Sequence, residues 1–154
     1  MIKRVLIMSA SALIALGLTT FVASPAAYAS TACTGKGCDG LDPTQSNHNG
    51  NTCSSSATSS LTQPALGGTI ELRYGPNCGT NWNRFTPGDN DSYQIWVTRN
   101  SDGVWAGTGL YHTYQFSNAN GVAHYSDQVY RTGAGGTSVC VDDLTFGARA
   151  CFTA

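Results

Sequence analysis

The chain has 154 residues, of which eight are lysine or arginine and nine are aspartate or glutamate, and its formal net charge at neutral pH is −1. Charged residues make up only 11% of the sequence, and no basic stripe interrupts it. Proteins that bind nucleic acids by neutralising phosphates carry an excess of positive charge, so this composition argues against nucleic-acid binding.

The first 29 residues have the three regions of a secretory signal peptide. A basic start is followed by an apolar run over residues 5–22 and by the small-x-small sequence Ala27-Tyr28-Ala29. The sequence predicts a signal peptide over residues 1–29, cleaved between Ala29 and Ser30, and a secreted protein that no membrane segment retains. A membrane anchor over the same run, or a lipid anchor on Cys33, fits less well. The run is rich in small residues, and Cys33 lacks the large aliphatic residue that usually stands three positions earlier.

The remaining residues 30–154 have the length of one domain and are expected to fold as one unit. Residues 30–66 contain no aromatic residue and show no hydrophobic periodicity, yet they hold three of the six cysteines. Such a segment buries too little apolar surface to fold alone, so we expect it to be irregular and stapled by disulfides.

Residues 67–154 show short alternating runs separated by turn signals, which are typical of antiparallel strands. The expected strands are 69–74, 80–85, 93–99, 104–116 with a bend at its glycines, 122–130, and a final hairpin of 138–141 with 146–152. This pattern predicts an all-β fold, a small antiparallel sandwich or barrel. We expect Trp82, Trp96 and Trp105 to lie in its core and at its rim.

An even number of cysteines in a small exported chain indicates disulfides. Cys140 and Cys151 lie on the two strands of the expected final hairpin, and we predict that they pair. The other four cysteines allow three pairings that the sequence leaves open; they are Cys33, Cys38, Cys53 and Cys78. A metal site is not expected, because Cys53 and Cys78 stand alone in the sequence and no histidine pair accompanies them. No cofactor is expected either.

The stretch Gly75 to Gly79 predicts a rigid turn that presents Cys78. Only arginines stand near Cys78 in the sequence, and five other cysteines offer partners, so we interpret Cys78 as a staple between the polar segment and the sheet. A second turn is expected at Asp42-Pro43, with the Asp42 carboxylate capping the backbone.

Several segments together resemble the YjfA-like family of small secreted bacterial proteins, a domain of unknown function. The segments are "GCDGLDPTQ" (37–45), Cys53 with the "SSSA" after it, "IELRYGPNCGTNWNRF" (70–85) and "ARACF" (148–152). Departures from the family pattern are Gly75 in place of serine, Asn83 in place of alanine and Ser56 in place of an acidic residue. The resemblance implies secretion, a Gram-positive source and cysteine-linked β structure, and it supplies no catalytic residue.

One constellation is compatible with catalysis. Glu71 and Arg73 project from the same strand face, and His112 lies in a strand rich in tyrosine. Small secreted ribonucleases use a base, a cation and an acid of these types, provided that the three groups share one cleft. In the other interpretation, Glu71 and Arg73 are solvated cross-strand partners.

A binding function requires no motif that the sequence lacks. Exposed aromatic side chains on a β face can hold glycans or peptides, although aromatics at alternating positions are often core residues. The candidates are Tyr74, Trp82, Trp96, Trp105, Tyr111, Tyr114, Tyr125 and Tyr130. The sequence therefore favours a secreted, non-catalytic binding or structural module that contacts a cell-wall glycan or an extracellular protein. A small hydrolase using Glu71, Arg73 and His112 is the alternative.

Overall fold

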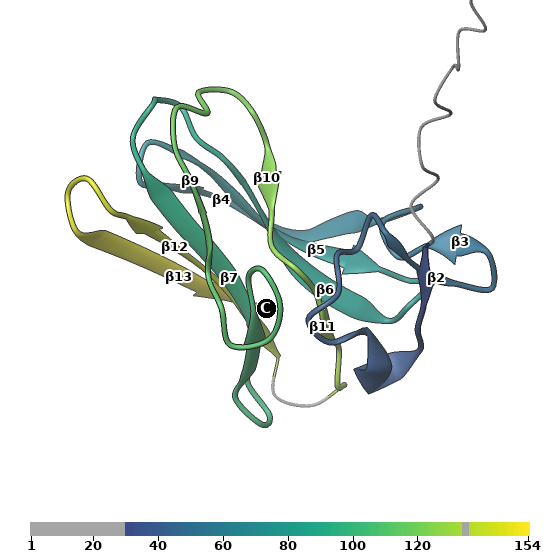
Figure 1. The fold of residues 1–154 in the computed structure, drawn as a ribbon. Helices are drawn as coiled ribbons and strands as arrows, with labels where there is room; N and C mark the ends of the chain where they lie inside the picture. The colour runs from purple at the N-terminus through teal and green to yellow at the C-terminus, as the bar shows by residue number, and fades with distance from the viewer. Residues whose placement is uncertain (1–29, 134–135) are drawn as a thin grey trace, which may run out of the picture.

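The computed structural model describes residues 30–133 and 136–154 and forms an all-β sandwich of two open sheets (Figure 1). The predicted signal peptide lies outside the described residues. Within the described part of the chain, no helix is long and apolar enough to cross a membrane. Among the described residues, one 3₁₀ turn, η1 (Gly35–Cys38), interrupts the β structure.

The first sheet has the order β10-β6-β5-β4, and β11 also pairs with β6. Its strands are β4 (Thr58–Ala65), β5 (Gly68–Gly75), β6 (Thr80–Thr86), β10 (His124–Tyr125) and β11 (Val129–Tyr130). The inner face is formed by alternating residues, with Ile70 opposite Phe85 in the β5–β6 register.

The second sheet has the order β13-β12-β7-β8, with β9 pairing to the other end of β7. Its strands are β7 (Tyr93–Arg99), β8 (Val104–Ala106), β9 (Tyr114–Phe116), β12 (Thr137–Asp143) and β13 (Ala148–Thr153). Tyr93, Ile95 and Val97 are fully buried, as the alternation of this strand predicts. They pack with Val139, Val141 and the inner face of the first sheet in one apolar core.

A small third sheet orders the N-terminal segment at one end of the sandwich, beside β11 (Figure 1). It consists of β1 (Thr31–Ala32), β2 (Ser46–His48) and β3 (Asn51–Thr52). Backbone hydrogen bonds join this segment to the main domain, since Gly40 donates to Gln128 and Gln128 donates to Leu41, at 2.8 and 3.1 Å. Asp42 accepts the backbone N–H of Thr44 at 2.7 Å, which confirms the expected capped turn.

Strand β4 lies within the polar range 30–66, where the sequence shows no periodicity. It pairs with β5 along its length through a two-residue turn, Leu66-Gly67, in which both residues have positive φ. The strand is the edge of its sheet and only Ala65 in it is buried, so it has no apolar face to display in the sequence. The sheet therefore begins at residue 58.

The long strand expected over 104–116 is divided into β8 and β9 at the glycine bend. A Cβ at Gly107 would lie 2.3 Å from the carbonyl oxygen of His112, so the chain folds back closely on itself there. The stretch expected to extend over 122–130 contains only the two short strands β10 and β11.

Candidate functional site

The structure brings Glu71 and Arg73 together but places His112 elsewhere. Glu71 lies on the outer face of β5, and its carboxylate pairs with Nη1 of Arg73 at 3.3 Å and with Nη1 of Arg84 at 3.2 Å. Ser59 of β4 also donates to it. His112 is an exposed residue of the loop between β8 and β9, on the second sheet. Glu71 therefore bridges three strands of the first sheet, whereas His112 lies in a loop of the second sheet.

The three tryptophans lie in two environments. Trp82 projects from the outer face of β6 and is only 1% exposed, because the N-terminal segment covers it. Trp96 and Trp105 project from the outer face of the second sheet, where Trp96 alternates with the buried Ile95 and Val97 of β7. They are half-buried, and we call their surroundings the aromatic face.

The aromatic face is a set of rings in edge-to-face contact. The centroids of Trp96 and Trp105 lie 6.5 Å apart at 65°, and those of Trp105 and Tyr111 lie 6.1 Å apart at 86°. Tyr111 is 56% exposed and has a φ of 62°, which is unusual for a bulky residue. Its N–H donates to the carbonyl of Trp105 at 2.9 Å, so the strained backbone holds the Tyr111 ring beside Trp105.

Polar side chains complete this face. The Asp142 carboxylate accepts from Nε and Nη2 of Arg149 at 2.6 and 2.7 Å, and from Nε2 of Gln94 at 2.7 Å. The Arg149 guanidinium lies 5.0 Å from the Trp96 ring centroid, and its hydrogen bonds lower the pKa of Asp142. Gln94 and Arg149, with the two tryptophans, border a hollow of about 270 Å³. Its lining residues are Gln94, Trp96, Thr98, Trp105, Thr113 and Arg149.

A second hollow, the polar cleft, lies where four segments meet. It has a volume of about 300 Å³ and is lined by residues of the 42–44 turn, the 107–108 bend, β9 and residues 123–127. Asp127 accepts the backbone N–H of Gly109, and burial raises its pKa to about 6, with a further contribution from the negative charge of Asp42. A carboxyl group in this state retains its proton in mildly acidic solution.

His124 lines the same cleft. Its ring stacks on Phe116, with centroids 3.9 Å apart, and its Nδ1 lies 3.2 Å from the Tyr114 hydroxyl. The Nε2 atom is buried without a hydrogen-bond partner, and burial lowers the pKa of His124. Sequence reasoning did not select Asp127 or His124, because only the fold brings these two into one cleft with Asp42.

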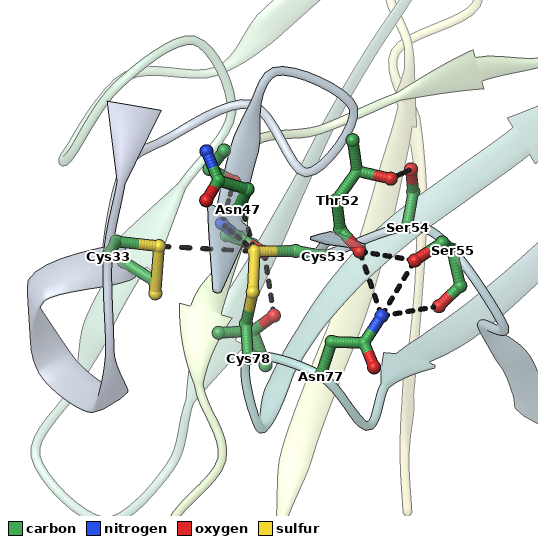
Figure 2. The surroundings of a disulfide bond; sticks show 12 residues. Cys33, Asn47, Thr52, Cys53, Ser54, Ser55, Asn77 and Cys78 are labelled. Carbon is green, nitrogen blue, oxygen red and sulfur yellow. Dashed lines mark hydrogen bonds between the residues drawn. A yellow bond between two sulfur atoms is a disulfide. The ribbon is translucent and has the colours of Figure 1, made fainter. Parts of the chain in front are cut away.

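The cysteines of the N-terminal half form one cluster. Cys33 is bonded to Cys38 and Cys53 is bonded to Cys78, and the Sγ atoms of Cys33 and Cys53 lie 3.9 Å apart (Figure 2). The four Sγ atoms all lie within 4.8 Å of one another and all four residues are buried. The sequence suggested that Cys53 and Cys78 stand apart, whereas the fold gathers them with the other pair.

The Cys53–Cys78 disulfide joins the loop after β3 to the turn between β5 and β6. Beside it, Nδ2 of Asn77 donates to the carbonyls of Thr52 and Ser55 at 3.1 and 3.2 Å and to the Ser55 hydroxyl at 2.7 Å (Figure 2). The turn at 75–79 thus holds the polar segment both covalently and by hydrogen bonds.

The third disulfide joins Cys140 to Cys151, which face each other directly in the β12–β13 register. Cys140 is also opposite Trp96 in the register of β12 and β7, so this disulfide lies on the outer side of the second sheet.

Comparison with known proteins gives one match. Residues 36–140 match the model of a family described as "Protein of unknown function (DUF2690)". No curated protein and no solved structure matches the chain. Since the match covers more than half of the chain, the protein belongs to this family of unknown function, DUF2690.

Proposed function

We propose that this protein is a secreted, non-catalytic module that binds a glycan of the cell envelope through the aromatic face. The observation that carries the proposal is the set of half-exposed rings of Trp96, Trp105 and Tyr111 next to fixed polar groups of Gln94 and Arg149. Half-exposed aromatic rings with satisfied polar neighbours form a surface that is both apolar and hydrogen-bonding, as a sugar ring is.

The charge of the face favours a neutral sugar over a polyanion. The Arg149 guanidinium is paired with Asp142 by two hydrogen bonds, so no unpaired cation faces the hollow. Gln94 and Thr113 offer amide and hydroxyl groups that can exchange hydrogen bonds with sugar hydroxyls. A peptide partner would make fewer specific contacts here, because the backbone of β7 is already paired with neighbouring strands and cannot pair with a peptide strand.

Three features support export. Residues 1–29 have the form of a signal peptide cleaved between Ala29 and Ser30, three disulfides suit an oxidising compartment, and the motifs resemble those of the YjfA-like family of Gram-positive bacteria. We propose that the mature protein is a single unit of residues 30–154, stapled at its N-terminal segment and followed by the β domain. Under this proposal the Cys140–Cys151 bridge holds the hairpin that carries Arg149.

The test uses the secreted protein with insoluble peptidoglycan and with a soluble N-acetylglucosamine oligomer. We expect co-sedimentation with the former and a change of tryptophan emission with the latter. Trp96→Ala and Trp105→Ala should each weaken binding at least tenfold, as central aromatic contacts do. Phe146→Ala is the matched control, because Phe146 is 76% exposed and does not line the hollow.

Two results would overturn the proposal. One is an absence of binding to both probes by the folded protein, and the other is binding that survives both tryptophan substitutions. Saturable binding to an unglycosylated extracellular protein through Trp96 and Trp105, without sugar binding, would assign the same face to a protein partner instead.

A hydrolase is the second candidate function, and the polar cleft is the observation that favours it. Asp127 can hold a proton below about pH 6, and burial lowers the pKa of His124 and so favours its neutral form, which gives the cleft an acid and a base. Glu71, by contrast, is paired with Arg73 and Arg84. Hydrolysis of RNA or glycan that is lost in Asp127→Asn and kept in Glu71→Gln and His112→Gln would support the cleft, and the reverse pattern would support the residues chosen from sequence.

A further inference from the structure

The four-cysteine cluster has the composition and spacing of a metal site. Its sulfurs come from Cys33 just before η1 and Cys38 at its end, from the loop after β3 and from the β5–β6 turn, so three parts of the chain converge on one point (Figure 2). Exposed fractions of these residues range from 0 to 8%. The spacing argument against a metal therefore does not apply to the folded chain.

A structural zinc ion takes four thiolates at about 2.3 Å, which puts the sulfurs of a tetrahedron about 3.8 Å apart. The Sγ atoms of Cys33 and Cys53 already lie 3.9 Å apart, and all others lie within 4.8 Å. If the two disulfides opened, the sulfurs within each former bond would need to separate, and the other pairs would need only small adjustments. Rotation about the Cα–Cβ bonds of the cysteines is enough to move the sulfurs by that distance.

Polar groups around the cluster are placed to support thiolates. The Ser46 hydroxyl lies 3.2 Å from Sγ of Cys53 and 2.7 Å from the Asp42 carbonyl, so its single hydrogen can be donated to either, and Nε2 of Gln128 lies 3.5 Å from the same sulfur. Nε2 of Gln128 also donates to Ser46, and Thr80 donates to the other end of the Gln128 amide. Such donors hold metal-bound sulfur in place and offset the charge of a tetrathiolate site.

We propose that Cys33, Cys38, Cys53 and Cys78, when reduced, form a tetrathiolate site for one zinc ion. A dithiol reductant supplies two electrons and two protons to each disulfide and is itself oxidised to a disulfide. Zinc then replaces the four thiol protons, which are released to solvent. The N-terminal segment is thereby held in both redox states, by two disulfides in one and by the metal in the other.

The test starts from the folded protein reduced with dithiothreitol, which is then removed under anaerobic conditions. Cobalt(II) is titrated as a spectroscopic probe, and native mass spectrometry counts zinc. We expect one metal ion per chain, with the strong visible bands of tetrahedral thiolate cobalt. The Cys53→Ser/Cys78→Ser variant should lose this spectrum, and Ser46→Ala should bind about tenfold more weakly.

The matched control is Cys140→Ser/Cys151→Ser, which removes the disulfide outside the cluster and should bind one ion with an unchanged spectrum. Amide exchange of residues 31–57 provides a second readout, because an unfolded chain can also bind metal. Zinc should restore the protection that reduction removes from this segment. Binding without restored protection, binding that survives Cys53→Ser/Cys78→Ser, or no binding to the reduced chain would each overturn the proposal.

Discussion

Nη1 of Arg99 donates to both carboxylate oxygens of Asp39, at 2.9 and 2.8 Å. Arg99 is the last residue of β7, on the inner side of the strand, and only 2% of it is exposed. Asp39 follows η1 and also accepts the backbone N–H of Tyr130. On its other side the guanidinium pairs with Asp102 at 2.8 Å. A buried arginine thus links the stapled segment to the second sheet.

We expect Asp39→Ala to lower the free energy of unfolding by about 3 kcal/mol, because it leaves a buried guanidinium without one of its two carboxylates. Urea unfolding monitored by circular dichroism measures the change.

The double variant Asp39→Ala/Arg99→Met serves as the control, since it removes the charge together with its partner. It should be less destabilised than the sum of the two single variants. Additive losses in this cycle would show that the pair does not act as a unit.

The two N-terminal disulfides should differ in their contribution to stability. Cys53–Cys78 closes a sequence separation of 25 residues, whereas Cys33–Cys38 closes only 5. In the chain-entropy model these loops correspond to about 3.5 and about 2 kcal/mol. The Cys53→Ser/Cys78→Ser variant should therefore be cut rapidly by protease within residues 30–57, with β4 and the rest of the sheet protected.

Limited proteolysis with mass spectrometry locates the cuts. Cys33→Ser/Cys38→Ser is the comparison, and it should be cut more slowly in the same range. Unchanged protection of residues 30–57 after loss of Cys53–Cys78 would contradict the view that this disulfide is a staple.

The fold class could be predicted from the sequence because local alternation decides it. Strand β7 places Tyr93, Ile95 and Val97 in the core at every second position, and turn residues mark its ends. Strand β4 could not be predicted in this way. In this edge strand only Ala65 is buried, so it has no apolar period.

The candidate sites could be predicted only in part. Aromatic residues were identified, but the division between the buried Trp82 and the exposed aromatic face depends on which strands the N-terminal segment covers. The cysteine cluster and the Asp127 cleft depend on contacts between residues far apart in the chain. Arg99 continues the inward alternation of β7, and its pairing with Asp39 and Asp102 makes that position tolerable.

Asp127 should make stability depend on pH. The pKa of its carboxyl is about 6 in the folded protein against an ordinary value of 3.8, because burial disfavours the charge. Between these values the folded protein keeps a proton that the unfolded chain releases, so the free energy of unfolding decreases as pH rises through this window. Asp127→Asn should remove the decrease and be more stable than the parent above pH 6, by about 1 kcal/mol after allowance for partial exposure.

Thermal unfolding at a series of pH values checks this, with Asp102→Asn as a control of opposite sign. Hydrogen bonds from Arg99 lower the pKa of Asp102 to about 2, so its contribution is present above pH 3.8 and is lost as the pH falls toward 2. Asp102→Asn should therefore be less stable than the parent at neutral pH and converge with it in acid. Parallel profiles for the parent and Asp127→Asn would show that Asp127 titrates normally.

The stapled segment packs closely against the first sheet at Gly75. A Cβ at this position would lie 2.2 Å from the carbonyl oxygen of Cys53 and 2.8 Å from the Trp82 ring. Both neighbours are held, one by the Cys53–Cys78 disulfide and the other by burial, so neither can move away cheaply. Gly75→Ala should therefore destabilise the protein by about 1–3 kcal/mol.

Gly37→Ala is the matched control, because nothing lies within 4 Å of its Cβ position, and it should change stability by less than about 0.5 kcal/mol. Urea unfolding of both variants, followed by tryptophan emission, measures the difference, and equal stabilities would mean that the segment does not press on the sheet at Gly75.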